Sequence, residues 1–207
     1  MAITAKKLIA AFVIVLSAGI VTFGGFYVAD AVQPQEKAGT QVERPSFTFD
    51  AAIAPDWFSG ANYWPDANEY TGNQVTEADL PVVSMTVNLG TATKPGPCFI
   101  TYSYKNGPID VAAEIKNIEI FSVNKSEGLI LSKLGEKSVT MKTSEGSKDY
   151  QINQYEFAGP GSSSMAKGAQ FAYIPLKDGH VEIRGYCETA EQLADTMPAL
   201  LAVGFKA

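Results

Sequence analysis

The stretch "QFAYIPLKDGHVEIRGYC", from Gln170 to Cys187, is the clearest folding signal in the chain. Its first half is a short run of apolar and aromatic residues, and apolar and polar residues alternate along its second half; both patterns are typical of strands in a sheet. Between the halves stands Asp178-Gly179, a residue pair typical of the two-residue type I′ turn of a hairpin. A turn at that pair fixes the register as Ile174 opposite Ile183, Leu176 opposite Val181, Phe171 opposite Tyr186 and Tyr173 opposite Arg184. The stretch therefore predicts a hairpin with one aliphatic face and one aromatic face that carries a cation.

The segments on either side extend this pattern. Further strands are predicted in "FTFD" (47–50), "PVVSMTVNL" (81–89), "CFITYSY" (98–104), "KSVTMKT" (137–143) and "KDYQINQYEF" (148–157). In the last of these the apolar residues change parity, which either a bulge near Asn153–Gln154 or burial of both faces would explain. Helical spacing behind Asp110 predicts a helix near 111–118. A terminal helix is predicted over 189–205, where Thr189 and Gln192 fit a capping box.

The order of these elements is β-β-β-α-β-β-β-β-α, and it indicates an α+β fold. We expect one antiparallel sheet with helices packed on it, because each apolar face of a sheet must be covered by another layer.

The N-terminal segment has the features of a membrane anchor. Lys6 and Lys7 precede an uncharged apolar run from Leu8 to Ala29, longer than the roughly 20 residues that span a bilayer as a helix. Residues 1–31 are thus predicted to be a cytoplasmic stub and transmembrane helix, 32–46 a polar linker, and 47–207 an α+β domain outside the cytoplasm. The alternative is a signal peptide cleaved after Ala31, which would leave a secreted protein. Both alternatives place the domain outside the cytoplasm.

The chain contains two cysteines, Cys98 and Cys187. Two cysteines in an exported protein favour a disulfide. Strand parity supports the pairing, because Cys98 lies on the same face as Ile100 and Cys187 on the same face as Ile183. Two buried free thiols are the alternative.

The C-terminal half, "GAQFAYIPLKDGHVEIRGYCETAEQLADTMPALLAVGF", resembles the end of PsbP/Mog1-type domains, in which a closing hairpin is followed by a final helix. "FTFDAAIAPDWF" is similar to their opening segment, with Pro55 and Trp57 in the matching places. The resemblance implies an antiparallel sheet between helices and a non-enzymatic module. It implies no particular partner, because members of that fold have very different functions.

The composition argues against several kinds of chemistry. The net charge of −6 disfavours binding to nucleic acid, which requires a basic surface. The single histidine, His180, stands beside the predicted turn, where we expect an exposed position without a catalytic role. One histidine and two bonded cysteines do not make a zinc site. We therefore expect no catalytic residue, no metal and no cofactor.

The stretch "APDWFSGANYWPDANEY" (54–70) contains both tryptophans of the chain. Trp57 is expected to pack in the core. Tyr63, Trp64 and Tyr70 stand among polar residues and are candidates for stacking on a sugar or a partner side chain. The alternative is that these rings fold back onto the sheet.

Together these features predict a membrane-anchored, non-catalytic module for binding or envelope assembly. Its expected partners are the membrane, through the N-terminal helix, and another envelope protein or a surface glycan. An exported enzyme of unrecognised type and a purely structural surface protein remain the alternatives.

Overall fold

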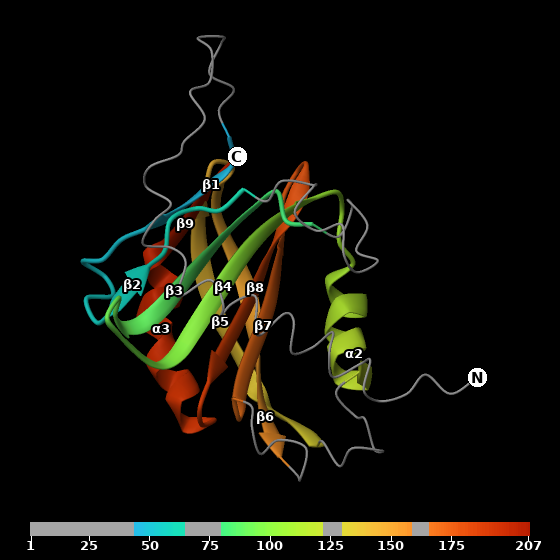
Figure 1. The fold of residues 1–207 in the computed structure, drawn as a ribbon. Coiled ribbons are helices and arrows are strands. Elements are labelled where there is room, and N and C mark those ends of the chain that lie inside the picture. The colour runs from blue at the N-terminus through green and yellow to red at the C-terminus, as the bar shows by residue number, and fades with distance from the viewer. Residues whose placement is uncertain (1–43, 65–79, 122–129, 159–165) are drawn as a thin grey trace, which may run out of the picture. The chain divides into compact units, whose positions relative to one another are not determined.

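The computed structural model describes residues 44–64, 80–121, 130–158 and 166–207. These residues form one nine-stranded sheet with two α-helices and a 3-10 helix (Figure 1). The strands are β1 Ser46–Phe49, β2 Trp57–Ser59, β3 Val83–Thr91, β4 Lys94–Asn106, β5 Ile130–Thr143, β6 Gly146–Ala158, β7 Gly168–Pro175, β8 Gly179–Cys187 and β9 Val203–Lys206. The helices are α2 Val111–Phe121, the 3-10 helix η6 Glu191–Thr196 and α3 Met197–Ala202.

The strands lie in the order β1-β9-β5-β6-β7-β8-β4-β3-β2, so the last strand of the chain lies beside the first. Neighbouring strands run antiparallel except β5 and β9, which are parallel where Lys142 and Thr143 face Gly204 and Phe205. The α+β prediction is therefore wrong, because the described chain is mostly one mixed sheet with short helices. Nothing in the described architecture identifies a PsbP/Mog1-type domain.

The main reason for this error is the chain's last segment. The predicted helix over 189–205 divides into η6, α3 and strand β9. Pro198 stands in the first turn of α3, a position that a proline tolerates. Gly204 then lies between β1 and β5, where an added Cβ would come within 2.8 Å of the Thr48 hydroxyl oxygen. Close packing between two strands thus overrides the helical pattern that precedes it.

The sheet curls until its two edge regions meet. Phe47 in β1 contacts Tyr102 in β4, with ring centroids 5.9 Å apart, although five strands separate them in the sheet order. Asn62, just after β2, spans the gap: its side chain accepts the Phe47 N–H and donates to the Phe47 carbonyl, each at 2.8 Å. One side-chain amide therefore replaces the main-chain pairing that would otherwise link the two edges.

The hairpin of β7 and β8 forms as predicted, but its register differs. Ile174 faces Val181, and Leu176 donates its N–H to the Gly179 carbonyl, so the turn residues are Lys177 and Asp178. The shift of two residues leaves every side chain on its predicted face, because faces alternate with period two. Gly179 is required for close approach instead, since an added Cβ would come within 2.2 Å of the Lys105 carbonyl oxygen.

The sheet buries side chains on both faces. The inner face packs on η6 and α3; it contributes Ile100, Tyr102 and Ile183 to the core, and α3 contributes Leu200. The outer face carries a second cluster of Tyr155, Phe157, Ala169 and Phe171. Strand β6 contributes to both, which confirms burial of both faces as the cause of its parity change. The irregularity in this ladder lies in the partner strand, between Lys133 and Gly135 of β5.

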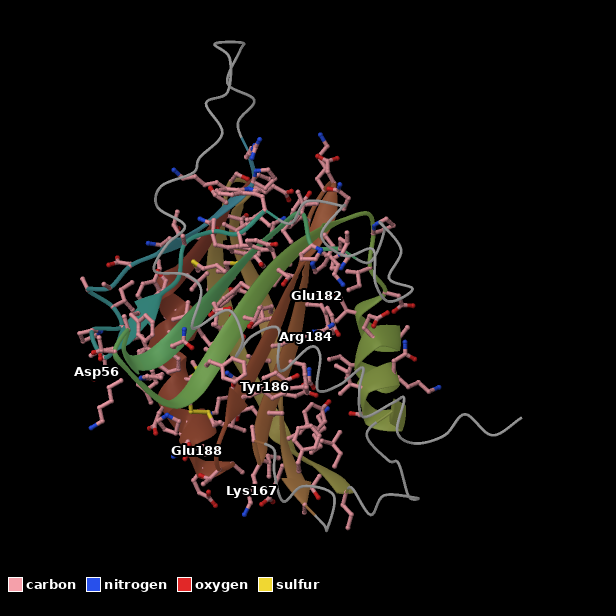
Figure 2. All side chains as sticks on the ribbon, in the orientation of Figure 1. Asp56, Lys167, Glu182, Arg184, Tyr186 and Glu188 are labelled. Carbon is pink, nitrogen blue, oxygen red and sulfur yellow. A yellow bond between two sulfur atoms is a disulfide. The ribbon has the colours of Figure 1, made fainter. Side chains whose placement is uncertain are left out.

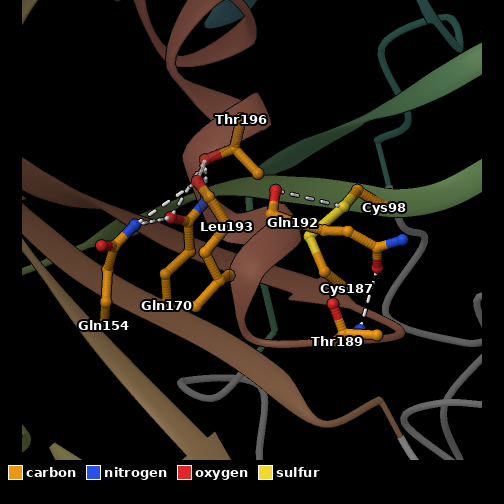
Figure 3. Close-up of a disulfide and its surroundings, with 8 residues drawn as sticks. All are labelled: Cys98, Gln154, Gln170, Cys187, Thr189, Gln192, Leu193 and Thr196. Atoms are coloured by element: carbon orange, nitrogen blue, oxygen red, sulfur yellow. Dashed lines mark hydrogen bonds between the residues drawn. A yellow bond between two sulfur atoms is a disulfide. The ribbon is translucent and has the colours of Figure 1, made fainter. Parts of the chain in front are cut away.

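The predicted disulfide is confirmed. Cys98 and Cys187 face each other across β4 and β8, with sulfurs 2.06 Å apart and Cα atoms 4.2 Å apart. Beside the disulfide, buried amides tie η6 to the sheet (Figure 3). Gln170 donates to the Thr196 hydroxyl at 3.0 Å, and Gln154 donates to the Gln170 side-chain oxygen at 3.2 Å. This network satisfies polar groups that would otherwise destabilise the interior.

The predicted transmembrane segment, residues 8–29, lies outside the described residues, as does the linker up to residue 43. Within the described ranges no helix is long and apolar enough to cross a bilayer.

Candidate functional site

Four aromatic rings form a row across the outer face of the sheet, one from each of four adjacent strands. Ring centroids are 5.4 Å apart between Phe99 and Tyr186, 5.9 Å between Tyr186 and Phe171, and 5.9 Å between Phe171 and Tyr155. The rings become more buried along the row: Phe99 and Tyr186 are partly exposed, Phe171 is 7 % exposed and Tyr155 is 0 % exposed. We call these four residues the aromatic row. Its open end offers rigid apolar area at the surface.

The row follows from the sequence. Phe99 follows Cys98 in its strand, and Tyr186 precedes Cys187 in the next strand. Because neighbouring side chains of a strand point to opposite faces, burial of the disulfide on the inner face turns these two rings to the outer face. Pairing of β4 with β8 then places Phe99 directly opposite Tyr186. Cross-strand aromatic pairs of this kind stabilise a sheet while exposing part of each ring.

A charged network adjoins the row on β8. Figure 2 shows Glu182, Arg184 and Tyr186 following one another along this strand. Lys105 donates to one Glu182 carboxylate oxygen and Arg184 to the other, each at 3.2 Å. Both oxygens of this nearly buried carboxylate therefore have a cationic partner, which fixes Glu182 as an acceptor. The Arg184 side chain is 41 % exposed and carries positive charge to the surface beside Tyr186.

His180 lies in the same network and is not at an exposed tip, as the sequence had led us to expect. The residue is 8 % exposed, its Nδ1 lies 3.1 Å from the Gly107 carbonyl oxygen, and its Nε2 lies 3.9 Å from Glu182. The cause is the shifted register, which draws His180 into the ladder opposite Lys105.

Helix α2 covers the buried end of the aromatic row. Asp110 caps the helix, as predicted, by accepting the Ala113 N–H at 3.0 Å. Ile118 packs against the outer cluster, and Tyr155 donates its hydroxyl to Glu119 at 3.2 Å. Burial, and then the charge of Glu119, raise the pKa of Tyr155 above its ordinary value of 10.0. Tyr155 therefore remains a hydrogen-bond donor at neutral pH.

A groove of ≈ 700 Å³ lies between α2 and the outer face of β5 and β6. We call it the α2 groove, and its lining residues are Val111, Ala112, Ile115, Lys116, Glu119, Lys133, Glu136 and Asn153. Lys133 crosses it, with its ammonium 2.6 Å from Glu136 on its own strand and 3.9 Å from Glu119 on α2. The aromatic row and the α2 groove meet at Glu119, which contacts Tyr155 and lines the groove.

The residues proposed from the sequence lie elsewhere, around the seam between β1 and β3. Trp64 is 40 % exposed; its indole N–H donates to the Pro45 carbonyl at 3.1 Å, and the Arg44 guanidinium lies 6.0 Å from its ring centroid. Tyr63 forms an isolated bridge with Ser84. Tyr70 lies outside the described residues. The structure thus brings Tyr63 and Trp64 together at one edge but does not place them in the aromatic row.

Trp57 is 5 % exposed and belongs to the inner core, as expected. No signal in the sequence marked Glu119 or the other residues of the α2 groove except Asn153. Asn153 did carry one: it is a polar residue that shares its parity with two aromatic residues of the same strand.

Within the described ranges no group of three His, Cys, Asp or Glu side chains is arranged to hold a metal ion.

Comparison with known proteins identifies no family for the chain: no protein-family model matches it, and no curated protein matches it.

Proposed function

We propose that the chain is a non-catalytic binding module, held at the outer side of a membrane by its N-terminal segment. We propose further that its outer face binds another envelope protein. The observation that carries this proposal is the aromatic row, with Phe99 and Tyr186 partly exposed beside the cation of Arg184. Aromatic and arginine side chains are the residues most often found at the energetic centres of protein interfaces.

Placement outside the cytoplasm is supported by two features. Lys6 and Lys7 ahead of the apolar run from Leu8 favour a cytoplasmic N-terminus and a translocated remainder. The Cys98–Cys187 disulfide is typical of proteins that fold in an oxidising compartment.

A protein partner is favoured over a glycan by the mixture of groups on this face. The outer face carries apolar rings, a partly exposed arginine and a groove bearing both signs of charge. Such a combination fits the varied side chains of a protein better than the repeated hydroxyls of a sugar.

The proposal is tested by capture of membrane proteins on the tagged full chain, quantified by mass spectrometry. The double variant Phe99→Ala/Tyr186→Ala is compared with a control, Ile53→Ala/Leu201→Ala, which truncates two residues that are 43 % and 49 % exposed away from the row. We expect the double variant to lose a specific protein that the control and the unmodified chain retain.

Equal recovery from both variants would refute the proposed surface. A ligand that survives protease treatment of the extract but not glycosidase treatment would identify a glycan and refute the protein partner. Turnover of a small-molecule substrate by the purified chain would favour the enzyme alternative.

A further inference from the structure

Strand β5 has a main-chain edge that no described strand covers over most of its length. On one side it pairs with β6 from Ile130 to Thr143, but on the other it pairs only with β9, through Lys142 and Thr143. Helix α3 contacts β5 and leads directly into β9, so it lies at that same end of the strand. Figure 1 shows the start of β5, in yellow, at the lower end of the sheet and away from α3. We call its first five residues, Ile130–Leu134, the open edge.

The open edge also carries exposed apolar side chains. Ile130 is 56 % exposed and Leu134 is 50 % exposed, the highest fractions among the large apolar residues of the described ranges. Both lie on the same face as Ser132, because side chains two residues apart along a strand point to the same side. An unpaired strand edge with exposed apolar residues is a template for pairing with another strand.

The features that commonly protect a strand edge leave this segment accessible. Charged residues and bulges are such features. In β5 the bulge lies between Lys133 and Gly135, so it comes at the end of the open edge. Lys133, the charged residue within the segment, has its ammonium 2.6 Å from Glu136 of the same strand. Its side chain faces the α2 groove, on the opposite face from Ile130 and Leu134.

We propose that the open edge pairs with the open edge of a second copy of this chain, antiparallel, about a two-fold axis at Ser132. Two identical strands related by such an axis are self-complementary, because the N–H groups of each copy meet the C=O groups of the other. The axis at Ser132 sets Ile130 of each copy opposite Leu134 of the other. Both exposed apolar side chains of the open edge are then covered by one contact, which a second copy supplies without any other partner.

The side chains of the segment favour this register over its neighbours. With the axis at Ser132, Leu131 lies opposite Lys133 of the second copy, so no like charges meet. An axis at Lys133 would set two ammonium groups opposite each other, which destabilises a cross-strand pair. An axis at Leu131 would place Leu134 beyond the open edge of the second copy.

The first test places a cysteine on the proposed axis. Cys98 and Cys187 are bonded to each other, so Ser132→Cys gives the full chain a single free thiol. Residues directly opposite each other in an antiparallel pair have Cα atoms about 4.5–5.5 Å apart, within reach of a disulfide. We therefore expect the purified variant, in detergent under air oxidation, to form a disulfide-linked dimer.

Ser138→Cys is the matched control, because Ser138 is an exposed serine of the same strand. It stands six residues from the axis, so in the proposed dimer it lies roughly 40 Å from its counterpart. This variant should remain monomeric under the same oxidation.

The second test exchanges the two exposed apolar residues for charges in the Ser132→Cys background. Ile130→Lys/Leu134→Lys sets like charges opposite each other twice, whereas Ile130→Lys/Leu134→Glu sets opposite charges there twice. We expect the first double variant to weaken dimer formation by about tenfold, and the second to stay within about twofold of the unmodified edge. Sedimentation of the same double variants with Ser132 retained measures self-association without the disulfide.

Three results would overturn the inference: no dimer from Ser132→Cys, an equal yield of dimer from Ser138→Cys, or the same behaviour of the two double variants. The last result would show that the strands do not meet in the proposed register. Capture of a partner through Phe99 and Tyr186 does not involve β5, so it decides the proposed function separately.

Discussion

The bridge formed by Asn62 leads to a quantitative prediction about how the curled sheet is held closed. Asn62→Ala removes two hydrogen bonds of 2.8 Å and leaves the Phe47 N–H and carbonyl without these partners in a residue that is 3 % exposed. Each bond contributes about 0.5–1.5 kcal/mol net, and unsatisfied buried groups add to the loss. We therefore expect the free energy of unfolding to fall by about 2–3 kcal/mol. For a domain of this size that corresponds to a Tm lower by roughly 4–12 °C.

The assay is thermal unfolding of the full chain in detergent, followed by circular dichroism. Asn62→Asp keeps the acceptor for the Phe47 N–H but sets a second acceptor against the Phe47 carbonyl, so it should also lower the stability. Gln151→Ala, an exposed position on β6, serves as the control. If Asn62→Ala lowers the stability by no more than the roughly 0.5 kcal/mol typical of surface positions, then Asn62 does not hold the edges together.

Three further predictions concern the core. Replacing both Cys98 and Cys187 by serine should lower the free energy of unfolding by about 4–5 kcal/mol, on the chain-entropy model for a separation of 89 residues. An unchanged midpoint of urea denaturation would contradict this. Trp57→Ala should lower the free energy of unfolding by about 3–5 kcal/mol, because Trp57 is buried. Trp64→Ala should lower it by about 1 kcal/mol, because Trp64 is 40 % exposed and makes one hydrogen bond. Equal losses of the two variants in chemical denaturation would refute this distinction. Burial raises the pKa of Tyr173 from 10.0 to about 12, so on raising the pH the unfolded chain loses this proton before the folded chain does. The contribution of Tyr173 to stability should therefore be fully present below pH 10 and be lost as the pH rises towards 12. Titration of every tyrosine near pH 10 in the folded protein would show otherwise.

Much of the local structure could be predicted from the sequence. Alternation identified the strands that contain Cys98 and Cys187 and the faces on which their side chains lie, so the disulfide could be predicted before any tertiary information. Asp110 marked the start of α2 for a similarly local reason, because an N-cap acts on amides only a few residues away.

The closure of the sheet depended on contacts that no local pattern contains. Strand β9 exists because Val203–Lys206 pairs with Ser46–Phe49 at the other end of the domain, and this pairing overrides the preceding helical pattern. The hairpin register moved because Gly179 is needed for approach to Lys105, a residue far away in sequence. The candidate surface was missed for the same reason: the aromatic row takes one ring from each of four strands.

Site-specific photocrosslinking in intact cells tests most directly the claim that the outer face of β4, β8, β7 and β6 binds a protein partner. A photoreactive residue is placed at Phe99, at Ile53 or at Leu201, which are all at least partly exposed and lie on different parts of the domain. We expect one discrete crosslinked protein from position 99, weakened by Arg184→Glu, and no such product from positions 53 or 201. The same product from all three positions, or none from position 99 with a product from the other two, would contradict it.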